Sequence, residues 1–498
     1  MVKRIWQQHS FIILVLVLAL GLRLPQLNGS LWLDEAAQAL ESSRPWSQQL
    51  QIAADFQPPL IHILLFFALK ISSAEWWLRT TVALIPGLIT IWASYEIGRK
   101  LISKKAGLIT SLLLATSSFH IFYSQELRPY SLPTMWAVLS WLPLLKAVKL
   151  KRFSRLHWLG YTAISLLGFY SSYLYPFFWI TQFIWVAWQQ RHKLREMITS
   201  AFLITLGFIP WLPSFLEQLR VGGTVRERLP GWDKVVSITQ LKSPALVVGK
   251  FIYGVMDIEL TSFFITSFVL IALISSYLFF ANLVKIKKTK ALKSFILIFS
   301  WMIIPLVLTW IVSFWIPVVR PKRVLFLLPA AYLFVSQIAT IGKKKIQQEW
   351  GMALVSILLL LNVWGVLQYH LNPNYQRENW RSLHQEIMTT YSPSETIFLF
   401  SYPNPFSPWR WYDQDLYPTL STGKLYIKNV VQLSEKIKIV NDYRYVILFD
   451  YLRDLTDPDD QLRTELWSLG FHEINTLDYP NVGFIRVFSK YKPMAAQL

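Results

Sequence analysis

The sequence predicts a polytopic α-helical membrane protein with about eleven transmembrane helices, one interfacial helix and a small C-terminal α/β domain. Three observations predict this class. Of the 498 residues, 53% are hydrophobic and only 16% are charged, whereas soluble proteins usually carry about 25% charged residues. The apolar residues fall in long runs, and the basic residues gather in alternate loops between them. Together these observations exclude a soluble globular enzyme and a disordered chain.

The first apolar run predicts a retained membrane-spanning helix over roughly residues 11–27, with its N-terminus in the cytoplasm. A cleavable signal peptide would end in small residues, but this run is followed by Arg23 and Pro25. Ten further crossings are predicted from apolar segments of similar length. They cover residues 78–98, 106–122, 131–148, 157–175, 176–190, 197–215, 262–284, 292–312, 324–341 and 351–368.

One apolar segment is too short to cross. A helix over residues 59–72 would span about 21 Å, less than the ~30 Å of the hydrocarbon layer. The segment also contains His62 and Lys70. We therefore expect it to lie in the outer interface.

The distribution of charge supports this assignment. The loops that it places in the cytoplasm hold 22 basic and two acidic residues, and their difference equals the whole net charge of +20. Cytoplasmic loops of membrane proteins carry this kind of excess. The basic total therefore reflects membrane topology, and no nucleic-acid partner is predicted.

The same topology predicts two domains. Residues 1–368 form a membrane domain with long outer loops at 28–77 and 216–261. Residues 369–498 lie outside the cytoplasm and hold 15 acidic against 13 basic residues. In this tail, strands are predicted at 397–400, 445–449 and 482–488, and helices at 378–391 and 460–469. Their alternation predicts a small α/β domain. The expected location is the inner or plasma membrane, with many crossings.

Ionisable residues are nearly absent from the centres of the predicted crossings and cluster in the outer loops. Asp34 and Glu35 precede a helix-favouring run, where they could act as a helix cap and first-turn acid or as a catalytic base. Asp55, Pro58 and Pro59 either start the interfacial helix or bind substrate.

Two further outer loops carry cations. Glu126 and Arg128 could be a surface pair, or Arg128 could face an anionic headgroup. In the second case we expect Glu126 to be catalytic and the flanking Tyr123 and Tyr130 to bind substrate. Basic residues are unexpected on the outer side of a membrane protein. The three basic residues Arg320, Lys322 and Arg323 therefore either pair with acidic residues of other outer loops or bind phosphate.

Carboxylates and cations at one depth suit group transfer from an anionic, lipid-linked donor. The cations would stabilise the departing phosphate, and a carboxylate would take the proton of the attacking group. The chain has no cysteine, and His62 and His120 have no ligand partners at metal spacing. We therefore predict no cofactor and no resident metal; a divalent metal is neither required nor indicated.

The order of these motifs resembles the polytopic GT-C glycosyltransferases of family 39 type, which include protein O-mannosyltransferases and the bacterial transferase that adds aminoarabinose to lipid A. The resemblance covers about residues 1–385. It rests on Arg23, W-x-DE at 32–35, PPL at 58–60, Glu75 with Arg79, YSQE-x-R-x-Y-S-L at 123–132, the segment 320–329, and E-x-W-R at 378–381. Gln57 departs from the aminoarabinose branch, which carries a Lys before the double proline.

The resemblance implies an inverting transfer of a monosaccharide from a polyprenyl-phosphate donor at the outer face of the membrane. Asp34 matches the family's proposed base, and Glu126 matches a second acidic position. Arg128 and the group at 320–323 match positions expected to hold the donor phosphate. We place Asp34 on one side of the sugar and these cations on the other. The expected partners are the donor, a lipid, protein or glycan acceptor, and membrane lipids.

Two other classes compete with this interpretation. A lipid-linked saccharide flippase would share the basic loops and the outer phosphate site, but it would be expected to carry charges at the membrane midplane. A structural membrane protein with a partner-binding tail would not need carboxylates matched by cations across several outer loops. We therefore predict a glycosyltransferase, with the flippase as the alternative.

Overall fold

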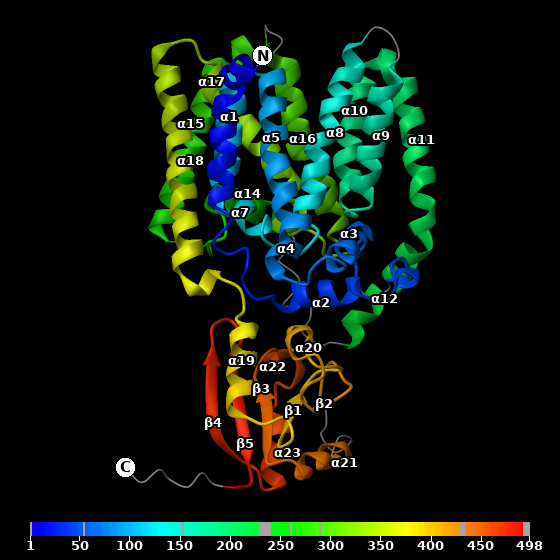
Figure 1. Ribbon diagram of the computed structural model, residues 1–498. Helices are drawn as coiled ribbons and strands as arrows, with labels where there is room; N and C mark the ends of the chain where they lie inside the picture. The colour runs from blue at the N-terminus through cyan, green and yellow to red at the C-terminus, as the bar shows by residue number, and fades with distance from the viewer. Residues whose placement is uncertain are drawn as a thin grey trace. The chain divides into compact units, whose positions relative to one another are not determined.

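The computed structural model describes residues 2–52, 55–150, 154–228, 241–258, 261–287, 291–427 and 434–491. It divides into two compact units, and each is described by itself. The first unit comprises Met1–Asn28, Pro45–Leu216 and Ile238–Tyr375, and the second comprises Gly29–Arg44, Glu217–Ser237 and Gln376–Leu498. The first is the helical bundle and the second contains the sheet (Figure 1).

The first unit consists of helices, and one of its boundaries with the second unit lies within the helix Leu212–Arg228, after Leu216. A helix occupies each predicted crossing. The elements are α1 Val2–Gly21, α4 Glu75–Arg79 continuing through a π-helical turn into α5 Ile85–Leu101, α6 Lys104–Thr116, α7 Ser118–Tyr123, α8 Ser131–Lys149, α9 Arg155–Phe169, α10 Tyr175–Gln189, α11 Leu194–Phe208, α12 Leu212–Arg228, α14 Ser243–Tyr253, α15 Ser262–Lys287, α16 Ala291–Val312, the 3-10 helix η5 Pro321–Leu327, α17 Leu328–Ile341 and α18 Lys345–Leu371.

Seven helical segments among the described residues are long and apolar enough to cross a membrane alone. The helices α6, α9 and α10 are shorter, at 13, 15 and 15 residues, so the number of eleven crossings stays a prediction. The interfacial segment forms α3, Leu60–Leu69, with 10 residues. Ten helical residues span about 15 Å, which is too short to cross.

Two of the predicted crossings have different bounds. The first was expected to reach residue 27, but α1 ends at Gly21, because Pro25 cannot continue a helix. The crossing expected at 106–122 is interrupted at Ser117, whose backbone is extended and whose hydroxyl caps α7. At this interruption the buried Arg23 donates to the carbonyls of Leu114 and Ala115, at 3.3 and 3.0 Å. These are last-turn carbonyls that a helix leaves without partners.

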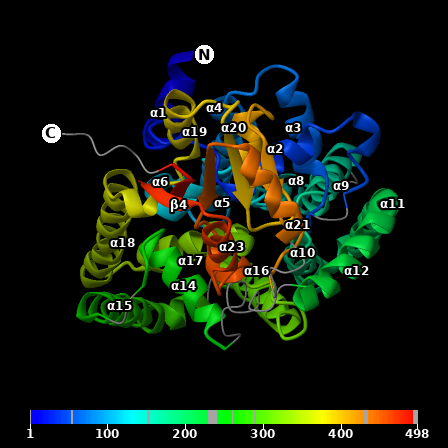
Figure 2. The ribbon, with the colours of Figure 1, turned by 90° about the horizontal axis from the view of Figure 1, so that it is seen from below.

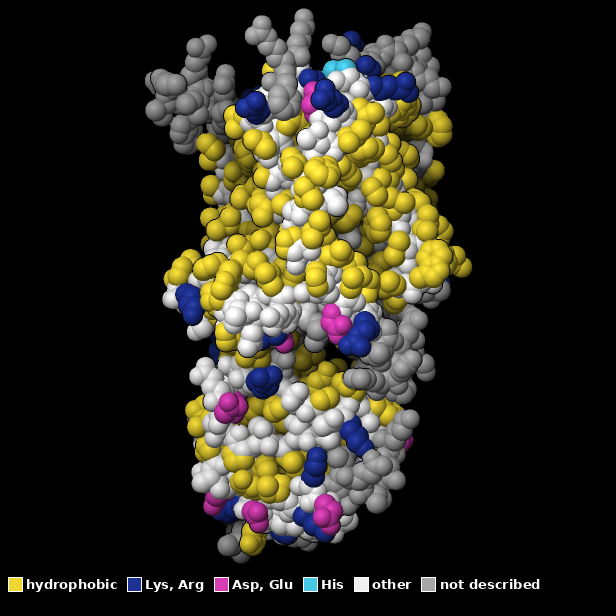
Figure 3. All heavy atoms as spheres, turned by 90° about the vertical axis from the view of Figure 1, so that its right-hand side faces the viewer, with side chains coloured by type: hydrophobic (Ala, Val, Ile, Leu, Met, Phe, Trp, Pro, Cys, Tyr) yellow, Lys and Arg dark blue, Asp and Glu magenta, His cyan; other side chains and the backbone are white. Residues whose placement is uncertain are grey.

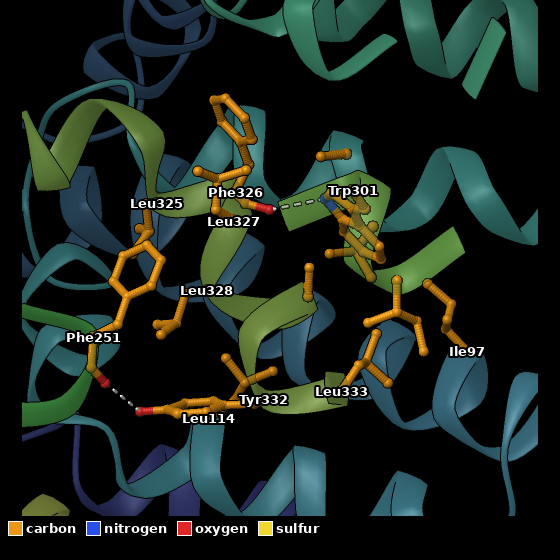
Figure 4. Close-up of a cluster of buried hydrophobic side chains, with 14 of the residues drawn as sticks. Ile97, Leu114, Phe251, Trp301, Leu325, Phe326, Leu327, Leu328, Tyr332 and Leu333 are labelled. Carbon is orange, nitrogen blue, oxygen red and sulfur yellow. Dashed lines mark hydrogen bonds between the residues drawn. The ribbon is translucent and has the colours of Figure 1, made fainter. Parts of the chain in front are cut away.

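The core of the first unit is packed with large apolar side chains. Figure 4 shows one part of it, where the Trp301 indole donates to the carbonyl of Phe326 and the Tyr332 hydroxyl donates to that of Phe251. The helices α5 and α6 cross closely, because a Cβ added at Gly98 would lie 2.7 Å from the Cα of Gly107. In Figure 2, α15 and α18 run side by side, and contacts between them confirm this.

The surface of the first unit carries a belt of exposed apolar side chains, with Lys and Arg gathered at its upper end in Figure 3. Phe202, Leu273 and Leu360 are among the exposed side chains, at 61%, 63% and 69%. Water would not favour such a surface, whereas lipid would. Of the predicted cytoplasmic basic residues, Lys151, Arg152, Lys288 and Lys290 lie outside the described residues, as do 229–240 and 259–260 of the second outer loop.

The second unit is built on a five-stranded sheet in the order β2-β1-β3-β5-β4. The strands are β1 Thr396–Phe400, β2 Thr419–Ser421, β3 Tyr445–Phe449, β4 His472–Tyr479 and β5 Gly483–Ser489. The pairs β1–β2 and β1–β3 are parallel, and β5 pairs antiparallel with β3 and β4. The five predicted strands and helices of the tail are all present, the helices as α19 Trp380–Thr390 and α23 Gln461–Ser468.

Side chains from the central strands alternate between two cores. Phe398 and Phe400 of β1 join Trp380 and Trp409 on one face. Ile397 and Leu399 join residues of α23 on the other face. Strand β1 is buried along its whole length, as expected for a parallel strand covered on both sides. The first face is covered by α19 and by α20, Ser407–Asp413, which also packs against α2, Leu33–Ser42.

Candidate active site

In the first unit, a cluster of polar side chains surrounds the carboxylate of Asp55 in the loop before α3. His62 of α3 lies 3.0 Å from the Asp55 carboxylate through Nε2, and the Gln57 amide donates to the same carboxylate oxygen. Arg128, from the loop between α7 and α8, acts on Asp55 electrostatically. Burial alone would raise the pKa of Asp55, but the hydrogen bond from His62 and the charge of Arg128 outweigh it and lower the pKa below its ordinary value.

The Arg128 loop also meets the cationic segment before α17. Lys322 of η5 lies over the ring of Tyr130, with its Nζ 5.3 Å from the ring centroid. The ring of Tyr123 packs edge-on against Tyr130 at 5.2 Å. A cation over an aromatic face is stabilised by the ring quadrupole. The structure therefore brings together, in one unit, the predicted residues Asp55, Arg128, Tyr130 and Lys322 through pairwise interactions.

The remaining predicted residues of this unit flank those pairs. Glu126 is buried at 1% exposure and lies two residues before Arg128. Pro58 and Pro59 are buried, and Pro59 stands at the N-cap of α3. The next amide, of Leu60, donates to the carbonyl of Tyr170, so the double proline directs the loop onto the α9–α10 turn. Two further predicted residues are partly exposed at the start of η5: Arg320 and Arg323.

The predicted base belongs to the second unit. Asp34 and Glu35 lie in the first turn of α2. Asp34 is partly exposed, whereas Glu35 is buried. The carboxylate of Glu35 forms an ion pair with the guanidinium of Arg377 at 3.6 Å, and both side chains are almost completely buried. Glu35 therefore has a structural partner, and its catalytic assignment stays a prediction.

The tail supplies a second carboxyl beside Asp34. Glu378 accepts hydrogen bonds from the backbone of Leu33 at 3.2 Å, the indole of Trp380 at 2.6 Å and the hydroxyl of Tyr451 at 2.8 Å. Burial raises the pKa of Glu378 to about 7, and the negative charge of Asp34 adds to this effect against the lowering by the three hydrogen bonds. Burial, followed by the charges of Glu378 and Asp34, also raises the pKa of Tyr451.

Three residues of these clusters, His62, Glu378 and Tyr451, were not selected as site residues from the sequence. His62 lies one turn after the double proline, but no ligand spacing marked it. Glu378 belongs to a recognised motif, yet its role depends on a segment 345 residues away. Tyr451 follows a strand end, where functional side chains often lie, but nothing local distinguishes it from other tyrosines. Among the described residues, no group of three or more His, Cys, Asp or Glu could hold a metal ion.

The chain was compared with protein-family models, with curated proteins and with solved structures. Residues 56–216 match the family model described as dolichyl-phosphate-mannose-protein mannosyltransferase. A search of curated proteins by sequence found no significant match.

Among solved structures, the fold is similar to that of ArnT from Cupriavidus metallidurans in the apo state, with a TM-score of 0.60 at 11% identity over 99% of both chains. The same ArnT bound to undecaprenyl phosphate matches with a TM-score of 0.58 at 11% identity, over 98% of this chain and 100% of that one. The archaeal oligosaccharyltransferase AglB from Archaeoglobus fulgidus, in complex with an inhibitory peptide and a dolichol-phosphate, matches with a TM-score of 0.53 at 11% identity, over 99% of this chain and 75% of that one.

At 11% identity these structures establish the fold, and the family model adds the enzyme class over residues 56–216, which contain Glu126 and Arg128 and begin directly after Asp55. The chain is a polytopic membrane glycosyltransferase with the GT-C fold.

Proposed function

We propose that this enzyme transfers a monosaccharide from a polyprenyl-phosphate donor to an acceptor hydroxyl or amine at the outer face of the cell membrane, with inversion at the sugar C1. The observation that carries the proposal is the grouping of cations on neighbouring loops of the first unit. Arg128 interacts with Asp55, and Lys322 lies on Tyr130. Two cations on converging loops suit a phosphate, which guanidinium and ammonium groups bind well.

The reaction assigns one role to each group. The acceptor oxygen or nitrogen forms a bond to C1, while the bond between C1 and the phosphate oxygen breaks. The phosphate leaves with the electron pair, and Arg128 and Lys322 stabilise its developing charge. Asp34 takes the acceptor proton. Because the leaving group is a monophosphate, we propose turnover without a divalent metal.

Three features support the donor class and the location. The ArnT structure that matches this fold was solved with undecaprenyl phosphate, and the AglB structure with a dolichol-phosphate. The apolar belt and the basic end of the first unit agree with a multi-pass topology in which that end faces the cytoplasm. In this topology the N-terminus is cytoplasmic and the tail extracytoplasmic.

The proposal is tested with purified protein in lipid and a panel of labelled polyprenyl-phosphate sugars. Wild type should release polyprenyl phosphate in EDTA. Asp34→Asn should lower release by about 10²- to 10⁴-fold, the usual contribution of a general base, while donor binding is retained. Asp454→Asn, an exposed carboxylate of the same unit, is the matched control. Retained turnover in Asp34→Asn would contradict the base. Movement of donor between leaflets without release would favour the flippase.

A further inference from the structure

The proposed base, Asp34, lies in the first turn of α2, and the side chain before this helix does not cap it. The N-cap of α2 is Trp32, whose side chain makes no capping hydrogen bond. The first backbone amides of a helix have no partners within the helix, and an acidic group is favoured at this end. Here the tail provides the acceptor, because Oε2 of Glu378 receives the amide of Leu33 at 3.2 Å.

The Glu378 carboxyl is itself held in a fixed orientation. Its Oε2 also accepts from the Trp380 indole at 2.6 Å, and its Oε1 accepts from the Tyr451 hydroxyl at 2.8 Å. Trp380 is 1% exposed and packs in the core of the sheet unit. The carboxyl thus links a rigid part of the tail to the residue immediately before Asp34.

Neighbouring contacts fasten the same segment on both sides of Asp34. The amide of Arg381 donates to the Ser30 hydroxyl at 3.1 Å, and the amide of Leu31 donates to the Tyr412 hydroxyl at 2.8 Å. Beyond Asp34, the pair of Glu35 with Arg377 holds the first turn of α2. Residues 377–381 therefore contact both the residues before Asp34 and the residue after it.

We propose that Glu378 is a positioning residue that holds Asp34 in place for proton transfer, and that its charge tunes Asp34 as a base. This inference rests on the proposed function. Tyr402 and Tyr451, after β1 and β3, interact electrostatically with Asp34, and Tyr451 also interacts with Glu378. The other charged groups along the two segments are Glu35 and Arg377, which pair with each other, and Arg381. An ionised Glu378 places a second negative charge close to Asp34, and this charge favours the transfer of a proton from the acceptor.

Two substitutions of Glu378 separate its hydrogen bond to the Leu33 amide, which positions Asp34, from the effect of its charge. Glu378→Gln keeps an acceptor oxygen for the Leu33 amide but carries no charge at any pH. Glu378→Ala removes both. Glu435→Gln, an exposed carboxylate of the tail, is the control. Turnover is measured with the polyprenyl-phosphate sugar that wild type consumes, from pH 5.5 to 8.5, and amide exchange is measured over residues 31–36 and over β3.

In wild type, kcat should rise as the pH passes about 7, the value at which Glu378 ionises. Glu378→Gln should keep the acid-side kcat within about threefold and lose the rise. Glu378→Ala should lower kcat tenfold or more with donor KM little changed, and residues 31–36 should exchange faster while β3 does not.

A wild-type kcat in Glu378→Ala, unchanged exchange at 31–36, or an intact pH rise in Glu378→Gln would overturn the proposal. If β3 also exchanges faster in Glu378→Ala, that variant is unfolded, and the pH profile of Glu378→Gln decides. If wild type consumes no donor, the proposed function fails, and the exchange of residues 31–36 still decides whether Glu378 fastens the segment.

Discussion

Asp55 in the first unit and Glu378 in the second are both carboxyls withdrawn from water and held by side-chain hydrogen bonds, yet their pKa values move in opposite directions. Burial raises the pKa of both groups. Around Asp55, His62 and the cation Arg128 overcome that effect and lower the pKa. Around Glu378, three neutral donors do not overcome it, and the anion Asp34 adds to it.

The difference shows that the hydrogen-bond donors and charges around a carboxyl, rather than burial alone, decide the direction in which its pKa moves here. The lowered pKa keeps Asp55 ionised, and an ionised carboxylate can orient the cation Arg128. Glu378 changes its protonation state near neutral pH, as suits a group that adjusts a neighbouring base. The two carboxyls are therefore expected to have different roles: Asp55 orients a cation, and Glu378 influences the neighbouring Asp34.

The largest expected effect concerns the stability of the second unit. Because the pKa of Glu378 is raised, folding favours its protonated form, and the stability that this gives is present below the ordinary pKa of 4.5. That stability is lost as the pH rises towards 7. A change from 4.5 to about 7 corresponds to about 3 kcal/mol.

Amide exchange in β1 and β3, corrected for the intrinsic rate, should report this loss between pH 5 and pH 8. Glu378→Gln should remove most of the dependence, and the exposed control Glu435→Gln should keep it. An equal pH dependence in Glu378→Gln and wild type would show that another group titrates there, and the contrast with Asp55 would fail.

The sequence predicts much of this fold because many of its elements have local signatures. Long apolar runs mark the bundle helices, and residues 397–400 and 445–449 are apolar throughout, as buried strands are. Strand β4 was missed because it lies at the edge of the sheet and is largely exposed, so its sequence HEINTLDY lacks a continuous apolar face. The break at Ser117 was also missed, because the carbonyls beside it are bonded by Arg23, a side chain from a distant part of the sequence that follows α1.

The candidate site was predictable only in part, because some of its contacts join residues that are far apart in the sequence. Asp34, Asp55 and Arg128 could be selected because charged residues are rare in such a sequence. The contact between Leu33 and Glu378 joins positions 345 residues apart, and no local pattern reports a contact at that separation. The assignment of Asp34 as base and of Arg128 as phosphate ligand stays a prediction until variants are measured.

The second largest expected effect is a loss of donor affinity when Arg128, the cation beside Asp55, is replaced. Arg128→Gln removes a charge that is proposed to bind the donor phosphate, and charge-assisted hydrogen bonds contribute about 1.5–3 kcal/mol. We expect the donor KM to rise by roughly 10- to 100-fold. The control is Arg155→Gln, an exposed arginine at the start of α9. If donor KM is unchanged while kcat falls, Arg128 acts on the transition state alone and does not bind the ground-state donor.

The smallest effect should follow from Asp55→Asn, and this variant also tests whether Asp55 takes part in proton transfer. The pKa of Asp55 is lowered in the folded state, so the stability it contributes is present above its ordinary pKa of 3.8 and is lost as the pH falls below that value. Asp55→Asn should remove this acid dependence and cost about 1–2 kcal/mol near neutral pH, since the bond to His62 loses its charge assistance. Amide exchange over Leu60–Leu69 measures this loss, with the exposed carboxylate variant Asp257→Asn as control.

Turnover of the same variant decides the chemical question. If Asp55 only orients Arg128, Asp55→Asn should keep at least a tenth of wild-type kcat at saturating donor, because the amide still fills the site beside His62. A loss as large as that of Asp34→Asn would mean that Asp55 takes part in proton transfer. In that case Asp55, paired with His62, would act as the base, and Asp34 would no longer be assigned that role.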